Sequence, residues 1–201
     1  CGSSTAMLSN ARRVCPPTGG AGEINTYDDG GGGGGGRIAI AYTTKTYTGS
    51  TTAYGGSGLQ AGGAGTVWTK AAAATNGDLL LDNNSLAGTT TQVAAATWTV
   101  NDLTLKNAAM FVIPSGATVN VAGTLANFTS GVTLTNNGTL SITGVVPAFP
   151  TGGSTLTNNG SLSLAATTTL TNITLIQNWT LTTLTTLTLG SGATLDFQNL
   201  T

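Results

Sequence analysis

Carboxylates are the residues that could do acid–base chemistry or bind a metal ion here, and the chain has few of them. Acid–base catalysis by carboxylates needs two of them held close together. Asp28 and Asp29 are the only adjacent pair, and neighbours in an extended segment point to opposite sides. The full set is Glu23, Asp28, Asp29, Asp78, Asp82, Asp102 and Asp196.

The best available carboxylate group is Asp78, Asp82 and Asp102, because the first two could share a strand face and Asp102 follows about one repeat later. This group could bind calcium or take part in catalysis, or it could simply cap corners or face solvent. No charged residue occurs between Asn107 and Leu195, and the chain has no histidine. A Ser–His–Asp set is therefore impossible, and two cysteines near one end do not make a zinc site. We expect no enzyme activity, cofactor or metal.

The overall composition narrows the class of protein further. The net charge is −1, charged residues make up 6% of the chain, and hydrophobic residues make up 39%. Charged disordered tails have the opposite balance, and a nucleic-acid binder needs a basic stripe that six scattered cations do not provide. No apolar run approaches the roughly 20 residues of a membrane-spanning helix. We therefore expect neither nucleic-acid binding nor a membrane span.

Residues 1–36 are predicted to form an irregular N-terminal cap. Cys1 and Cys15 close a short loop, which in an oxidising compartment predicts a disulfide. An alternative is that Cys1-Gly2-Ser3-Ser4, which resembles the start of a mature bacterial lipoprotein, carries a lipid on Cys1. Both alternatives place the chain outside the cytoplasm. The seven glycines 30–36 predict a loop or linker, because glycine has high backbone entropy and no side chain to bury.

From residue 37 onward the pattern is that of short β-strands. Leucine, valine and isoleucine alternate with threonine, as in Val132-Thr133-Leu134-Thr135, so apolar side chains fall on one face. About a fifth of the residues are threonine and 30 are glycine, which disfavours helix. The expected strands are 37–42, 65–69, 79–82, 98–105, 117–121, 132–135, 139–143, 155–157, 162–164, 170–175 and 194–197.

An internal repeat indicates how these strands are arranged. The stretch 134–142, LTNNGTLSI, recurs 22 positions later as 156–164, LTNNGSLSL. Without helices, a period of about 22 residues is typical of one coil of a parallel β-helix, so we assign 37–201 to that fold. Stacked coils would place corner asparagines above one another, where their amides could hydrogen-bond along the axis. The predicted asparagine ladder is Asn136, Asn137, Asn158 and Asn159.

Three segments carry a resemblance to a known group of proteins. Gly35-Gly36-Arg37-Ile38-Ala39-Ile40, then Gly62 to Trp68 (GGAGTVW), then Asp78 to Asn83 (DLLLDN), resemble a module of very large bacterial surface proteins. Those proteins are right-handed β-helices of the adhesin and autotransporter-passenger type. The resemblance implies an all-β, right-handed parallel β-helix located outside the cell or at its surface. It transfers no catalytic residue.

Two surfaces are candidates for contact with a partner. Aromatic rings can stack on sugars, and threonines in register resemble an ice-binding face, although threonine suits any exposed strand. These residues form a candidate lateral binding surface for glycan or ice: Tyr42, Tyr47, Tyr54, Thr133, Thr135, Thr155 and Thr157. The second surface is an insertion with two prolines, which cannot donate to a β-ladder and should bulge outward as a contact loop. It comprises Val145, Val146, Pro147, Phe149 and Pro150.

The leading hypothesis from the sequence is an extracellular structural protein, a filament or adhesin-stalk subunit. Residues 195–201 show no cap, so we expect the coils to continue into more of the same protein or into another subunit. Near-zero net charge also favours association. The alternative is a β-solenoid binding module that uses its lateral threonine and tyrosine surface for glycan or ice.

Overall fold

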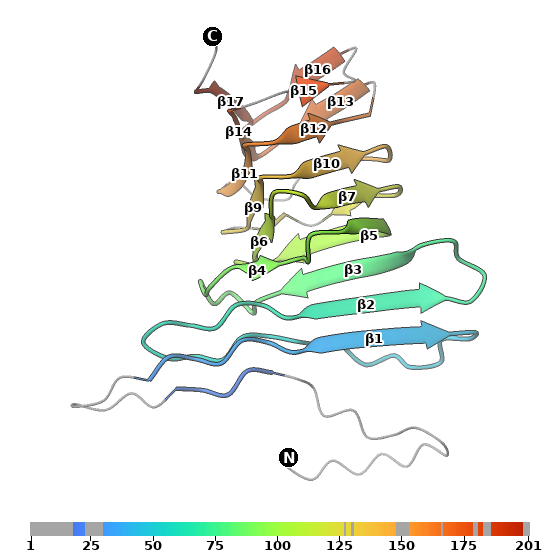
Figure 1. Cartoon of the computed structure of the whole chain (residues 1–201), viewed down its shortest axis with the longest axis vertical. Coiled ribbons are helices and arrows are strands. Elements are labelled where there is room, and N and C mark those ends of the chain that lie inside the picture. Colours follow the sequence, from blue (N-terminus) through green and yellow to red (C-terminus); the bar gives the residue numbers. More distant parts are fainter. Residues whose placement is uncertain are drawn as a thin grey trace.

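The regular structure of this chain is entirely β in the part that can be described. The computed structural model describes residues 18–22, 30–126, 128–129, 131–147, 153–165, 167–178, 181–182 and 186–198. Within them the strands β1 to β17 stack one above another from the N-terminal end to the C-terminal end (Figure 1). Two long sheets run along the stack, a two-stranded sheet lies near its C-terminal end, and the main core lies between them.

The largest sheet forms one wall of the stack and follows the order β1-β2-β3-β5-β7-β10-β12-β15, with β8 also paired to β5. Every pair in it is parallel except β2 with β3. Its strands are β1 (Arg37–Tyr42), β2 (Thr66–Ala71), β3 (Gly77–Asp82), β5 (Thr97–Lys106), β7 (Thr118–Val121), β8 (Leu125–Ala126), β10 (Thr139–Ile142), β12 (Ser161–Ser163) and β15 (Leu181–Thr182).

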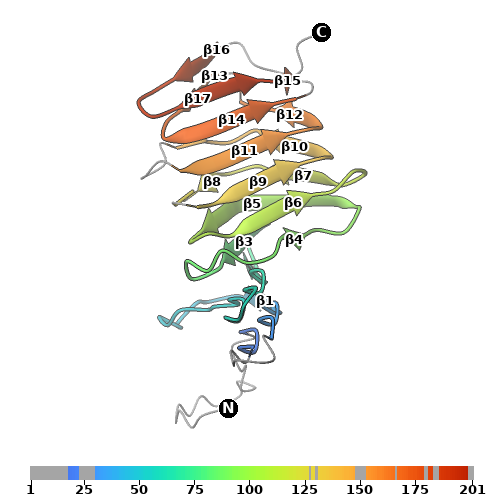
Figure 2. The same cartoon turned by 90° about the vertical axis from the view of Figure 1, so that its left-hand side faces the viewer.

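The second wall is a six-stranded parallel sheet, in full view in Figure 2, and a two-stranded parallel sheet lies beside it. The six strands, in order along the axis, are β4 (Thr91–Gln92), β6 (Met110–Ile113), β9 (Thr133–Asn136), β11 (Ser154–Asn158), β14 (Ile173–Gln177) and β17 (Thr194–Phe197). The two-stranded sheet pairs β13 (Thr167–Leu170) with β16 (Thr186–Leu189).

The number of residues between paired positions in the six-stranded sheet gives the length of each coil. Met110 lies opposite Thr133, Thr133 opposite Thr155, and Thr155 opposite Thr174, so the paired positions differ by 23, then 22, then 19. The prediction of a parallel β-solenoid with coils of about 22 residues is therefore confirmed. The individual coils vary because their turns differ in length while their strands keep the same alignment.

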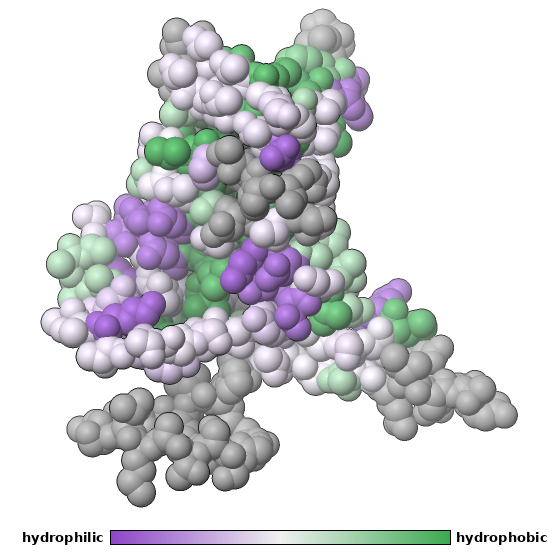
Figure 3. Space-filling view, turned by 180° about the vertical axis from the view of Figure 1, so that it is seen from behind, coloured by the Kyte–Doolittle hydropathy of each residue, from purple (hydrophilic) through white to green (hydrophobic). Residues whose placement is uncertain are grey.

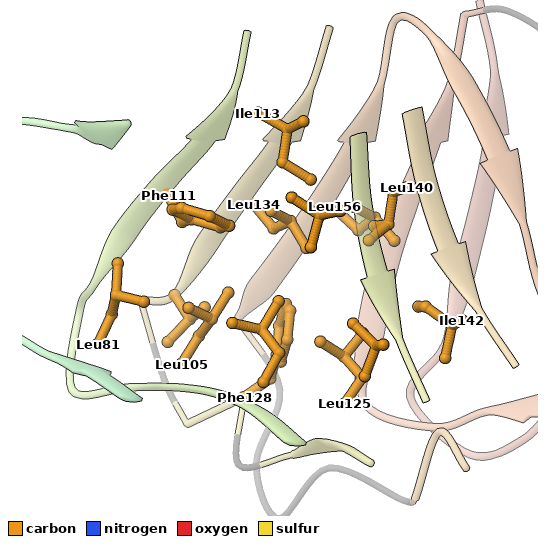
Figure 4. Packing of buried hydrophobic residues seen from close by; sticks show 14 of the residues in the cluster. Leu81, Leu105, Phe111, Ile113, Leu125, Phe128, Leu134, Leu140, Ile142 and Leu156 are labelled. Carbon is orange, nitrogen blue, oxygen red and sulfur yellow. The ribbon is translucent and has the colours of Figure 1, made fainter. Parts of the chain in front are cut away.

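Alternation fills the core as the sequence predicts. In β6, β9 and β10 every second side chain is buried, and leucine, isoleucine or phenylalanine occupies most of those positions. Phe111, Leu134 and Leu156 stack by register from coil to coil, and Figure 4 shows them in a row across from Leu105 and Phe128. Each fully buried side chain of this size contributes about 1.5–3 kcal/mol relative to exposure.

One corner of the solenoid contains a left-handed residue in coil after coil. Ser85, Ala108, Gly131, Gly153, Asn172 and Gly192 have φ between 56° and 92°. Each precedes a strand of the six-stranded sheet, and all except Ser85 lie one or two positions before it, where the chain changes direction. Backbone bonds join these corners along the axis, as from Ser85 N to Asn107 O at 3.0 Å. Asn172 explains one wrong prediction: residues 170–175 form two strands, β13 and β14, because this corner separates them.

The N-terminal end differs from the repeating coils. Residues 72–76 turn the chain back, so that β2 and β3 form an antiparallel hairpin with Val67 opposite Leu80. Continuous parallel stacking begins with β3 and β5. A small separate core of Ile38, Ala53 and Val67 lies under the β1–β2 part of the sheet.

The glycine-rich segments pack together beside this hairpin through their backbones. Gly19 and Gly22 donate to the carbonyls of Tyr54 and Ser57, and Gly32 and Gly35 donate to Gln60 and Gly63. Bonds at every third residue are typical of extended segments with about three residues per turn, where only glycine fits the crowded faces. Residues 30–36 lie outside the strands, as a loop does, but their hydrogen bonds tie them into a layer that a free linker would not form.

Candidate functional site

The asparagines at the corner after β9 and β11 stack in two columns. Asn136 pairs with Asn158 in the register, and its Nδ2 donates to Asn158 Oδ1 at 2.6 Å and to the Ser161 carbonyl at 2.8 Å. Asn136 Oδ1 accepts from Gly138 N at 3.2 Å, which holds the turn that follows. Both side chains of this column are fully buried.

The second column lies one residue further along and faces solvent. Asn159 Nδ2 donates to Asn137 Oδ1 at 2.8 Å, and Asn178 Nδ2 donates to Asn159 Oδ1 at 2.7 Å. The structure thus brings all four asparagines of the predicted ladder together, with Asn136 and Asn158 inside and Asn137 and Asn159 outside. Their hydrogen bonds run along the solenoid axis and connect one coil to the next.

The candidate threonines lie on the outward face of the six-stranded sheet. Thr133 lies opposite Thr155, and Thr135 lies opposite Thr157, which makes a grid of two coils by two columns. One column continues through Thr174 and Thr194, while the other continues with isoleucine and aspartate. Threonines also pair in register on the two-stranded sheet and on the nine-stranded sheet. Threonine ladders are therefore a feature of all three walls.

The carboxylates of Asp78, Asp82 and Asp102 all accept hydrogen bonds from other residues of the chain. A bulge places Asn101 and Asp102 opposite Asp78, and Asp78 Oδ1 accepts from Asn101 Nδ2 at 3.0 Å and from Asp102 N at 3.3 Å. Asp102 Oδ1 in turn accepts from Thr124 N at 2.7 Å. The arrangement connects three coils along one line. Such hydrogen bonds are what the corner-capping interpretation of these aspartates predicts.

Asp82 forms an ion pair with Lys106. Its Oδ2 lies 3.1 Å from Lys106 Nζ, and its Oδ1 accepts from Asn84 N and from Asn107 Nδ2, both at 2.9 Å. Asp82 is 7% exposed, whereas the Lys106 side chain is 36% exposed. The carboxylate therefore holds two left-handed corners, at Asn84 and Asn107, one above the other. Within the described ranges no group of three or more His, Cys, Asp or Glu could hold a metal ion.

The predicted disulfide pair and part of the contact loop lie outside the described residues. This applies to Cys1, Cys15, Phe149 and Pro150. The described part of the loop continues the wall of the solenoid. Val145 forms a parallel bridge with Thr124 and is 62% exposed, while Val146 packs against the core. Pro147 is half-buried at the end of this segment.

The tyrosines of the candidate binding surface are not gathered into one cluster. Tyr42 ends β1, Tyr47 is 52% exposed and donates to the Ser50 carbonyl, and Tyr54 lies in the glycine layer. Sequence reasoning missed a different group on β1 and β2, namely Arg37, Trp68 and Lys70. Only part of the signal was present: Trp68 and Lys70, at positions i and i+2 of one strand, share a face, but Arg37 joins them only through the register of β1 with β2.

The described part of the chain contains no helix with the length and apolarity required to span a bilayer. The fold defines the class of protein as a parallel β-solenoid. Comparison with protein families, curated proteins and solved structures found no match to this chain.

Proposed function

We propose that this chain is a structural segment of an extracellular surface protein, a non-enzymatic stalk or filament subunit. The resemblance of about residues 30–85 to modules of adhesin and autotransporter-passenger proteins supports a location at the cell surface. The low charge of the chain and the pairing of the aspartates with the chain's own donors support a mechanical role. On the face in Figure 3, strongly hydrophilic side chains gather mostly in the half of the molecule nearer the N-terminus.

The observation that carries this proposal is the continuity of the axial contacts. The register aligns Phe111, Leu134, Leu156 and Leu175 in one buried column. The amide of Asn136 bonds to Asn158 beside that column, and backbone bonds join the same coils on both sheets. A rod built in this way resists bending because any tilt of one coil breaks several hydrogen bonds together.

Electron microscopy of the purified chain over a concentration range, without ligand, tests the proposal. Fibres of one width, lengthening with concentration, are expected for a filament subunit, because a solenoid can extend by stacking end to end. Rods that stay short and dispersed at all concentrations would contradict a filament and leave only the stalk form. Globular particles without an elongated axis would contradict both forms.

A lateral binding module is the second candidate, and the threonine grid on the six-stranded sheet is the surface it would use. Threonine pairs on the other two sheets count against an ice-binding face confined to this wall. The distances between stacked strands, about 4.8 Å, set a regular spacing for Thr133, Thr155 and their neighbours. Partitioning of the chain into growing ice tests this candidate. If Thr157→Tyr on the grid and Thr169→Tyr on the two-stranded sheet change the partitioning equally, the grid is not an ice-binding face.

A further inference from the structure

One face of the β1–β2 pair carries cationic and aromatic side chains with no partner in the described structure. Arg37, Ala39 and Ala41 form the exposed face of β1, and the register places them opposite Thr66, Trp68 and Lys70. Side chains of directly paired residues project to the same side of a sheet. Arg37 and Lys70 therefore lie at opposite ends of this face, and Trp68 lies between them.

Small side chains leave this face open. The alanines opposite Trp68 and Lys70 fill little space, and a hollow of about 480 Å³ is lined by Ala41, Tyr42, Trp68 and Lys70 together with small neighbours. At the other end of the face a second hollow of about 220 Å³ is lined by Arg37, Thr66 and adjacent glycines and threonines. Both hollows are open to solvent, so a ligand would lie across this face and would not be enclosed by it.

Trp68 is held in place from one side. Its indole lies against Gly77, where an added Cβ would come within 2.5 Å of Nε1 and Cε2, and it also packs against the main core. The side chain remains partly exposed. The indole is thus a ring fixed on one side that lines a hollow.

The charged residues of β1, β2 and the segment that joins them are all cationic. Between Gly30 and Gly77 the chain contains Arg37, Lys45 and Lys70 and no aspartate or glutamate. Within the described ranges none of the three forms an ion pair, because the pair that exists there joins Lys106 to Asp82. Asp78 follows in β3 opposite Thr69, so its side chain projects from the other face of the sheet, where it accepts hydrogen bonds from the next coil. The face therefore carries positive charge that no described residue neutralises.

We propose that this face binds an anionic saccharide, with a sugar ring against Trp68 and carboxylate or sulfate groups at Arg37 and Lys70. Aromatic rings offer apolar area to sugar C–H groups, and guanidinium and ammonium groups bind anionic oxygens with charge-assisted hydrogen bonds. Two cations at the ends of one face suit a chain of several sugars better than a single one. This inference goes beyond the structural role, because it gives the N-terminal end of the rod a specific ligand.

Binding of the whole chain to a panel of oligosaccharides tests the inference. The probes are a galacturonate hexamer, its methyl ester, a sulfated galactan oligomer and a neutral galactan oligomer of similar length. We expect the galacturonate or the sulfated probe to bind, with affinity falling as salt rises, and the uncharged probes to bind at least tenfold more weakly. In NMR spectra, the indole N–H signal of Trp68 is assigned as the one that is missing from W68F. This signal should shift when the binding oligosaccharide is added.

The two cations of this face provide the matched variants. Arg37→Gln and Lys70→Gln should each weaken binding about tenfold or more, while Lys45→Gln, outside both hollows, should leave it within twofold. All three residues are exposed or half-exposed, so unchanged circular dichroism verifies folding. The inference is overturned if no anionic probe binds, if Lys45→Gln weakens binding as much as Lys70→Gln, or if the Trp68 indole signal stays in place. Binding of the galacturonate hexamer alone identifies a carboxylate ligand, and binding of the sulfated galactan alone identifies a sulfate ligand.

Discussion

At the scale of single residues, the role of an asparagine depends on whether its side chain points into the core or toward solvent. Alternation turns Asn136 inward and Asn137 outward although they are neighbours. The inner residue supplies hydrogen bonds where water cannot reach, and replaces the isoleucine that occupies the equivalent position, Ile113, one coil earlier. A buried amide is tolerated there because its donors and acceptor are satisfied within the stack.

The two columns predict different costs of substitution. Asn136→Ala removes three hydrogen bonds and leaves buried partners unsatisfied, so we expect a loss of about 2–4 kcal/mol in the free energy of unfolding. Asn137→Ala removes one exposed bond and should cost under about 1 kcal/mol. Urea denaturation followed by circular dichroism measures both. Equal losses for the two variants would show that the inner column is not specially stabilising.

At the scale of elements, the glycine layer makes a sharp prediction about two neighbouring residues. A Cβ at Gly35 would overlap the carbonyl oxygen of Ala53 and the amide of Gly65, whereas a Cβ at Gly34 would meet nothing within 4 Å. Gly35→Ala should therefore cost more than about 3 kcal/mol locally or open the layer, because backbone atoms cannot move aside cheaply. Gly34→Ala should be neutral or stabilise by up to about 1 kcal/mol through the unfolded state.

Hydrogen exchange distinguishes a local effect from a global one. The amides of Gly65 and Thr66 donate to Ala53 and Gly36, so they report on the layer. In Gly35→Ala they should exchange faster while the amides of β9 and β11 stay protected. Slow exchange of Gly65 and Thr66 in this variant would mean that the packing around Gly35 is looser than the contacts indicate.

The elements also show what could be predicted from the sequence and why. Alternation and the internal repeat were sufficient for β9, β10, β11 and β12, because each strand there buries every second side chain. The strand β6 (MFVI) was missed because its residues are all strongly apolar, with methionine and valine in place of outward threonines. The antiparallel β2–β3 hairpin was missed too, since alternation does not encode strand direction.

Part of the candidate site could likewise be predicted from the sequence, and part could not. The asparagine ladder could be predicted because stacking is a direct result of the repeat. The face of Arg37, Trp68 and Lys70 could not, because it depends on the register between two strands that are separated by a long glycine-rich segment. The tyrosines were chosen for residue type alone, and the chain places them in different surroundings.

At the scale of the whole molecule, the solenoid behaves as a column of nearly equivalent units. Coils of unequal length all stack because the strands keep their alignment and only the turns change length. Energies in such a protein are approximately a sum over coils and their interfaces. Removing one complete coil should therefore cost little beyond that coil's own contribution, provided that the strands on either side meet in register.

The repeat offers a place to make this cut. Deleting positions 137–158 joins Asn136 to Asn159 and restores the sequence LTNNG, so that β14 can stack on β9 with leucine opposite leucine. We expect a folded protein with the same circular dichroism per residue and a urea m-value lower by about a tenth, in proportion to the surface lost. Deleting only 137–147 moves the following half-coil onto the wrong wall and turns its apolar side chains away from the core. That variant should lose cooperative unfolding, and equal behaviour of the two deletions would contradict the independence of the coils.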